Sequence, residues 1–448
     1  MMKRGAMSAL VLWSSCLAML AVGANSTAIM AALPDMRADL SLSGSDVEWA
    51  VNAYLVVSAA CIVLGGQAAD RIGPRPASLL GLTLFGIASC IIAAASERPA
   101  LLAGRALQGL AAAFAVPSTL AAVSTNAAPE RRAAAIGAWA GFLMLGFSIG
   151  PFLGGALTHY TSWRVIFWLN VLLMLASIVG LASAGSTGTR KGMQSRHMDW
   201  TGFLLLATGM VSLVFALHGI PHAASAPLPV VGPFMLAGIA FALLMVVERR
   251  VQAPLVDLSF FARPRFVEGV AIGSLSMFSI MSLLLYFNLH AQSREGLGLT
   301  ALEAGAALLP LSATLLALAL SASAVATRLG LRKAMMGGMA LVAVAGAVIG
   351  MAITVGGMAL LAIGLLLMGA GLAVPYALAP RLALSVLPPA QAGQGSGIVN
   401  ACTFLGGSVG VAGGATAFLL GGFVAVLMMI VLAGIVGVIL GHAIGEAS

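Results

Sequence analysis

The sequence predicts an all-α polytopic membrane protein. Of its 448 residues, 60% are hydrophobic and only 8% are charged, whereas a soluble domain is roughly half apolar and a quarter charged. Apolar stretches of about 20 residues, the length that a helix needs to cross a bilayer, recur along the whole chain. Backbone groups cannot face lipid unpaired, and no segment alternates like a barrel strand, so helices are the spanning elements that fit.

Fourteen apolar stretches separated by short connections are predicted to be membrane-spanning helices. In chain order they are residues 8–33, 47–68, 77–95, 99–123, 133–158, 164–184, 200–219, 229–248, 265–290, 302–325, 333–353, 357–380, 392–413 and 417–440. We interpret the first as a spanning helix and not as a cleaved signal peptide, because its apolar run continues to about Leu33, which is long for a signal core. The longest polar connection, residues 185–197, follows the sixth stretch.

Lys and Arg residues are distributed unevenly between the two sides of the membrane that these helices define. With the N-terminus in the cytoplasm, 17 of the 22 fall in cytoplasmic segments. Arg37, Arg98, Arg164 and Arg294 fall outside, and Arg105 falls within a helix. This bias follows the positive-inside rule and predicts that both termini are cytoplasmic, in what we expect is a bacterial inner membrane. The net charge of +8 then orients the protein, and no nucleic-acid partner is expected.

A short internal repeat indicates that the chain has two related halves. The sequence DRIGPR at 70–75 ends the second predicted helix, and TRLGLR at 327–332 ends the tenth. Matching loops of this kind indicate duplication, which is common among transporters. We therefore expect a six-helix half at residues 1–185, a cytoplasmic linker with two inserted helices at 186–250, and a second six-helix half at 251–448.

Several motifs resemble those of the major facilitator superfamily. The stretch GGQAADRIGPRP at 65–76 is similar to its loop 2–3 signature, although Ala68 and Pro74 depart from the usual residues. GRALQG at 104–109 resembles its helix 4 motif, and GFSIGPFLGG at 146–155 resembles its antiporter helix 5 motif. The hallmarks of its fourteen-helix drug/proton antiporter branch are resembled by ALP (32–34), WAVNAYL (49–55), WRVIFWLN (163–170), DWTG (199–202) and LEAGAALLP (302–310). The resemblance implies a major facilitator fold with 14 transmembrane helices that works by alternating access.

The loop after the second helix is predicted to be an electrostatic latch on the cytoplasmic side. Gly66 and Gly73 permit a tight turn. Asp70 ends a helix, where its charge opposes the macrodipole, so it needs partners. Arg71 and Arg75 are local ones, and the start of the eleventh helix would supply further positive potential. The alternative is a solvated loop whose charges only follow the positive-inside rule.

The fifth helix carries a row of small residues. Gly146, Gly150 and Gly154 share one face at a spacing of four, Gly155 adjoins them, and such a face lets helices approach closely. Pro151 removes one backbone hydrogen bond and can bend the helix. The family resemblance implies that this element seals the interface between the halves in one state. Ordinary close packing is the alternative.

Arg105 is the intramembrane charge, and such residues are functional hypotheses by default. Gln108 is its polar neighbour, and the resemblance implies a part in proton coupling, with snorkelling to the surface as the alternative. The antiporter branch usually carries an aspartate in the first helix, where this chain has Asn25. Asparagine cannot titrate, so the proton carriers expected are the outer-end carboxylates Asp35, Glu48 and Glu303, with His290 as an alternative carrier. Solvated surface charge is the alternative for each.

A substrate cavity is expected between the halves near the midplane. Its candidate lining residues offer polar tips, aromatic faces and flexible sulfur: Asn25, Asn52, Tyr54, Gln108, Met144, Tyr286, Asn288, Tyr376, Asn400 and Phe404.

The functional expectation is export of small hydrophobic or amphipathic compounds by proton antiport. The sequence lacks the G-x-x-x-x-G-K-[ST] and H-E-x-x-H motifs, so we expect no enzymatic activity, no cofactor and no metal site. The expected partners are the lipid bilayer, a small-molecule substrate and protons, and the protein is expected to be a monomer. The alternatives are a proton symporter or facilitator for an organic metabolite, and a membrane sensor that does not transport.

Overall fold

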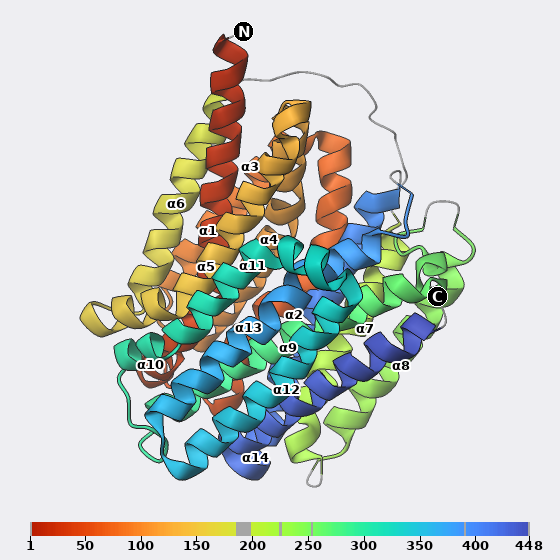
Figure 1. Cartoon of the computed structure of the whole chain (residues 1–448). Coiled ribbons are helices and arrows are strands. Elements are labelled where there is room, and N and C mark those ends of the chain that lie inside the picture. Colours follow the sequence, from red (N-terminus) through yellow and green to blue (C-terminus); the bar gives the residue numbers. More distant parts are fainter. Residues whose placement is uncertain (1, 185–198, 224–225, 252–253, 389–390, 447–448) are drawn as a thin grey trace. The chain divides into compact units, whose positions relative to one another are not determined.

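The described part of the chain is built from helices (Figure 1). The structure is a computed structural model, and it describes residues 2–184, 199–223, 226–251, 254–388 and 391–446. Within these residues, 13 helices are long and apolar enough to cross a membrane. The predicted fold class, an all-α polytopic membrane protein, is confirmed. The chain divides into two compact units, Met1–Met198 and Asp199–Ser448.

The first unit contains six long helices. They are α1 (Met2–Asp39), α2 (Gly44–Ile72), α3 (Pro74–Ala93), α4 (Arg98–Asn126), α5 (Arg132–Tyr160) and α6 (Arg164–Ser183), with the single-turn η1 (Pro129–Arg131) before α5. The helix α1 packs along α5 and α6, whereas α4 packs against both α2 and α3. The connection after α6, which includes Arg190, Lys191, Arg196 and His197 of the expected linker, lies outside the described residues.

The second unit begins with a helical pair and continues with a second long-helix bundle. The elements are α7 (Trp200–Gly219), η2 (Ile220–His222), α8 (Leu228–Glu248), η3 (Leu258–Ala262), α9 (Pro264–Gln292), α10 (Ala301–Ala307), α11 (Leu309–Leu329), α12 (Leu331–Val355), α13 (Met358–Leu384) and α14 (Ala392–Glu446). The helices α7 and α8, in green in Figure 1, pack on each other. Both lie in this second unit.

Two helix boundaries differ from the predicted ones. The predicted helix 302–325 is divided at Leu308 into the short α10 and the longer α11, where Pro310 lies in the first turn of α11 and cannot donate to the preceding turn. The predicted break at 414–416 lies instead at Gly421 and Gly422, inside α14. Gly422 has φ +62°, which glycine adopts without strain. The predicted stretch 302–325 thus corresponds to α10 and α11 together, and the last two predicted stretches both lie in α14. Each of the fourteen predicted spans therefore has a counterpart.

The two units repeat the same packing of glycine against backbone. In α5, a Cβ on Gly146, Gly150 or Gly154 would collide with α1. In α14, a Cβ on Gly406, Gly410 or Gly414 would collide with α9 in the same spacing of four. The loop glycines also correspond, since Gly73 (φ +93°) precedes α3 and Gly330 (φ +84°) precedes α12. The internal repeat therefore extends beyond the loop motif, and α1 and α5 correspond to α9 and the first half of α14.

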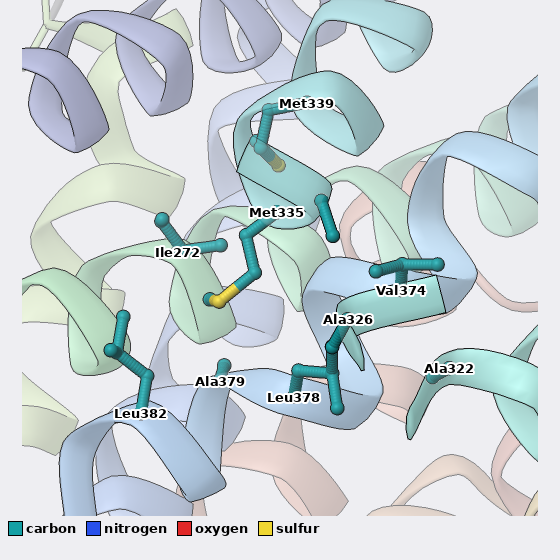
Figure 2. Close-up of a cluster of buried hydrophobic side chains, with 10 residues drawn as sticks. Ile272, Ala322, Ala326, Met335, Met339, Val374, Leu378, Ala379 and Leu382 are labelled. Atoms are coloured by element: carbon teal, nitrogen blue, oxygen red, sulfur yellow. The ribbon is translucent and has the colours of Figure 1, made fainter. Parts of the chain in front are cut away.

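An apolar cluster holds the second unit together on one side of α13. It is formed by Ile272 of α9, Ala322 and Ala326 of α11, Ala334, Met335 and Met339 of α12, and Val374, Leu378, Ala379 and Leu382 of α13. Figure 2 shows the Met335 side chain extending between Ile272 and the residues of α13. Small alanines let the four helices approach, and the unbranched methionines fill the remaining space.

Candidate functional site

A buried polar network lies within the first unit, in a setting that is otherwise apolar. At its centre is Arg105 of α4, which is 0% exposed. Its Nε donates to the Ala50 carbonyl of α2 at 2.7 Å, and Nη1 donates to Gln108 Oε1 at 2.6 Å. The guanidinium carbon also lies 4.7 Å from the centre of the Tyr54 ring, in cation–π geometry. Arg105 is therefore held inside the unit and does not snorkel to the surface.

The network continues from Gln108 into three further helices. Gln108 Nε2 donates to Ser89 Oγ of α3 at 2.9 Å and lies 3.4 Å from Asn25 Oδ1 of α1. Asn170 Nδ2 of α6 donates to the same Asn25 oxygen at 2.8 Å. One carbonyl oxygen of Asn25 thus accepts from α4 and α6 together. Ser26 extends the polar set by donating to the Tyr54 hydroxyl at 3.2 Å.

The network carries a net positive charge. The side chains that Arg105 contacts are neutral amides and an aromatic ring, and its Nη2 has no hydrogen-bond partner among the described residues. Elsewhere in the described chain, ion pairs join Arg98 to Asp46, Arg164 to Asp39 and Arg332 to Glu268, among others. Arginine stays protonated in proteins. The centre of the network is consequently a permanent cation without a carboxylate on it.

The remaining candidate cavity residues are spread over both units. In the first unit, Asn52 is fully buried in α2 and Met144 is half-buried in α5. In the second, the Tyr286 hydroxyl donates to the Val411 carbonyl at 2.6 Å, which joins α9 to α14.

The other four candidates of the second unit make hydrogen bonds or are partly accessible. Asn288 Nδ2 donates to the Leu284 carbonyl of its own helix, and Asn400 Nδ2 donates to the Ser396 carbonyl. Tyr376 and Phe404 are half-buried.

The latch residues occupy the end of α2 and the start of α3. Gly66, Asp70 and Arg71 lie in the last two turns of α2, and Gly73 separates the two helices. Arg75 has a partner that the sequence did not predict. Its Nε donates to the Leu181 carbonyl at 3.0 Å and its Nη2 to the Ala182 carbonyl, so it binds the C-terminal end of α6.

The candidate proton carriers are not brought together with Arg105 by any contact described in the structure. Asp35 is exposed in the last turn of α1, and Glu48 is half-buried in the first turns of α2. Glu303 is exposed and forms a capping box with Thr300, accepting from its backbone N–H at 2.8 Å.

The α5 glycines lie directly against α1. A Cβ on Gly146 would meet the Leu20 carbonyl, one on Gly150 would meet Thr27 Oγ1, and one on Gly154 would meet the Ala28 carbonyl. Thr27 Oγ1 donates in turn to the Phe147 carbonyl at 3.1 Å. Pro151 and Gly155 are buried in the same helix, which continues through Pro151 without interruption.

Three members of the network, Ser26, Ser89 and Asn170, were missed by sequence reasoning. Asn170 closes the motif WRVIFWLN, and Ser89 lies in an apolar helix. The signal for Asn170 was present, because an amide inside a membrane-spanning helix needs a polar partner. The second glycine row, Gly406, Gly410 and Gly414, was also visible in the sequence but was not recognised as the counterpart of the first.

Comparison with known proteins identifies relatives that carry the same fold. Over 319 residues the chain is 31% identical to a methylenomycin A resistance protein of Bacillus subtilis, covering 71% of this chain and 67% of that protein. Over 325 residues it is 30% identical to a tetracenomycin C resistance and export protein of Streptomyces glaucescens, covering 72% and 60%. The chain thus spans about two thirds of the length of the first relative and less than two thirds of the second.

Solved structures share the architecture across nearly the entire chain. An auto-inhibited POT family peptide transporter superposes with a TM-score of 0.71 at 14% identity, covering 98% of this chain and 96% of that one. The human organic anion transporter MFSD10 gives 0.64 at 18% identity, covering 98% and 99%. At such identities the likeness establishes the fold alone. The family model described as Major Facilitator Superfamily matches residues 15–411, and this chain, an integral membrane protein, belongs to that superfamily.

Proposed function

We propose that the protein exports small hydrophobic or amphipathic organic compounds across a bacterial inner membrane, in exchange for protons and by alternating access. The observation that carries this proposal is the fully buried Arg105 network in a Major Facilitator Superfamily chain. Ionisable groups inside membrane-spanning segments mark substrate and ion pathways, because burying them without function is costly. The relatives named as resistance and export proteins support the direction of transport and the substrate class.

In this proposal the two units change their mutual arrangement to open the pathway first to one side and then to the other. The latch of Gly66, Asp70, Arg71, Gly73 and Arg75 would favour one of these states from the cytoplasmic side. The α5 glycine row would let α1 and α5 move as one body, since their backbones are in contact. The proposal also places both termini in the cytoplasm and takes a single copy of the chain to be sufficient for transport.

Proton coupling is proposed to use Arg105 together with carboxylates at the outer ends of helices. Asp35, Glu48 and Glu303 are the candidates, because Asn25 cannot carry a proton. A second candidate function is a facilitator or proton symporter for an organic metabolite. It is favoured because no carboxylate contacts Arg105 among the described residues.

The test is flux measured in proteoliposomes with an imposed pH gradient and ethidium as the first probe. We expect substrate movement opposite to proton movement, and loss of the pH dependence in at least one of Asp35→Asn, Glu48→Gln and Glu303→Gln. Thr300→Ala is the control for Glu303, because it disturbs the same helix cap without removing a titratable group. Flux that ignores the pH gradient in the unmodified protein would instead support the facilitator.

A further inference from the structure

The second unit shows that this helix packing can form without a buried polar network like that of Arg105. The glycine contacts show which residues of the two units correspond to each other. Gly109 of α4 packs on α2 as Gly369 of α13 packs on α11. Likewise, Gly150 of α5 meets Thr27 as Gly410 of α14 meets Ser282. By these contacts Leu365 corresponds to Arg105 and Ile280 to Asn25. Both are buried, at 0% and 5% exposure. The same helix packing is thus built with apolar residues at these positions, so the fold itself does not require the cation.

The cost of the network indicates that its charge has a use. A buried guanidinium loses its hydration, and the penalty is several kcal/mol unless a counter-charge and hydrogen bonds replace it. Two of its nitrogens donate to neutral acceptors, and the Tyr54 ring adds cation–π attraction. The third nitrogen, Nη2, remains without an acceptor among the described residues. An anion that reached Nη2 would supply both the missing acceptor and the missing negative charge.

We infer that Arg105 binds the anionic group of the transported compound, so that the preferred substrates are amphipathic organic acids. The inference rests on the proposed transport function, because Arg105 is fully buried in this structure and a substrate reaches it only when the protein changes conformation. A carboxylate accepts charge-assisted hydrogen bonds from a guanidinium, which are about twice as strong as neutral ones. The neutral amides of Asn25, Gln108 and Asn170 orient the cation without cancelling it.

The identity of residue 25 is the specificity-determining feature in this inference. Asn25 Oδ1 lies 3.4 Å from Gln108 Nε2, and Gln108 in turn accepts from Arg105. An aspartate at this position would place a negative charge two hydrogen bonds from the guanidinium, with almost no change in side-chain size. The network would then be neutral overall, and an incoming anion would be repelled by Asp instead of completing the charge balance.

The experiment compares probes that differ in charge but not in skeleton. Naphthoate, naphthamide and naphthylmethylammonium are tested by equilibrium dialysis against the full-length protein in phosphatidylcholine nanodiscs, with empty nanodiscs as the blank. Decanoate, decanamide and decylammonium form a second series with a flexible skeleton. We expect each carboxylate to bind at least about 10-fold more tightly than its amide, a difference that one charge-assisted hydrogen bond readily supplies.

Two variants test the origin of that preference, and a third serves as the matched control. Arg105→Gln and Asn25→Asp should each abolish the preference for the carboxylate. Arg294→Gln removes one positive charge from an exposed site and should keep it. If Arg105→Gln fails to fold, Asn25→Asp still decides, because its side chain has nearly the same shape as the original.

The outcomes separate this inference from the proposed function. The absence of a carboxylate preference in the unmodified protein would overturn the inference, as would a preference that persists in Asn25→Asp. If ethidium is exported while no carboxylate is preferred, export stands and the anion site does not. If carboxylates are preferred but no compound of any charge crosses proteoliposomes, the anion site stands and the proposed export is wrong.

Discussion

Arg75 and Arg332 play the same part in their respective units. Arg75 donates to the Leu181 and Ala182 carbonyls at the end of α6, and Arg332 donates to the Gly441 and His442 carbonyls near the end of α14. Each is the last residue of the repeated loop motif, and each follows a glycine with positive φ. The Leu181 and Ala182 carbonyls lie in the last turn of α6, where carbonyls lack intrahelical partners and carry partial negative charge, so the Arg75 guanidinium satisfies both needs. Gly441 and His442 lie about one turn before the end of α14, where Arg332 is an additional donor to their carbonyls.

Replacing either arginine should therefore loosen the final helix of its own unit. We expect Arg75→Gln and Arg332→Gln each to lower the free energy of unfolding by about 1.5 to 3 kcal/mol, the usual value for hydrogen bonds to a charged group. Thermal unfolding of the purified protein in detergent measures the effect. Arg328→Gln, in the same motif but exposed, is the control and should change little. Equal effects at Arg328 and Arg332 would contradict the capping role.

The contact between α1 and α5 should not tolerate side chains at the glycine row. Gly154→Ala would place a methyl group against the Ala28 carbonyl and should cost about 1 to 3 kcal/mol, as overpacking does. Gly137→Ala, in the same helix, has open space around its Cβ and should be neutral or stabilising by up to about 1 kcal/mol. Detergent-solubilised melting temperatures compare the two. If both variants behave alike, the close approach of the helices is wrong.

Asp46 should matter more than the arginine that pairs with it. Asp46 is buried and accepts from the Ser43 backbone N–H at 2.9 Å in a capping box at the start of α2. Arg98, whose side chain is 60% exposed, lies 2.8 Å from its other oxygen. Asp46→Ala should cost about 0.5 to 2 kcal/mol through the lost cap, whereas Arg98→Gln should cost less than about 1 kcal/mol because exposed ion pairs are weak. Chemical unfolding with both single variants and the double variant checks this ranking, and the reverse order would refute it.

Tyr286 should contribute to stability mainly through the hydrogen bond from its hydroxyl to the Val411 carbonyl of α14. Its ring is fully buried and lies 5.3 Å from that of Phe418. Tyr286→Phe leaves the Val411 carbonyl without this donor and should reduce stability by about 1 kcal/mol. Tyr160→Phe, at a side chain that is 73% exposed, provides the comparison. A variant Tyr286→Phe of full stability with altered substrate preference would show that Tyr286 contacts the substrate instead.

The sequence by itself determined which segments of the chain are helices. Lipid excludes unpaired backbone, so apolar runs of spanning length must be helical wherever they occur. The fourteen predicted spans consequently match the helices, and the loop motif at 70–75 recurs at 327–332 in the second unit. The charge of Arg105 within an apolar helix also pointed directly to the centre of the polar network.

Only the tertiary structure decided which polar groups meet. Asn25, Gln108 and Asn170 are far apart in sequence, and their contact depends on how α1, α4 and α6 are rotated about their axes. That rotation is set by helix packing, above all by the glycines that fix how far one helix is shifted along the axis of its neighbour. The same reason explains why Arg75 reaches α6. Hydrophobicity specifies that a segment is a helix, but the fit between surfaces specifies its neighbours.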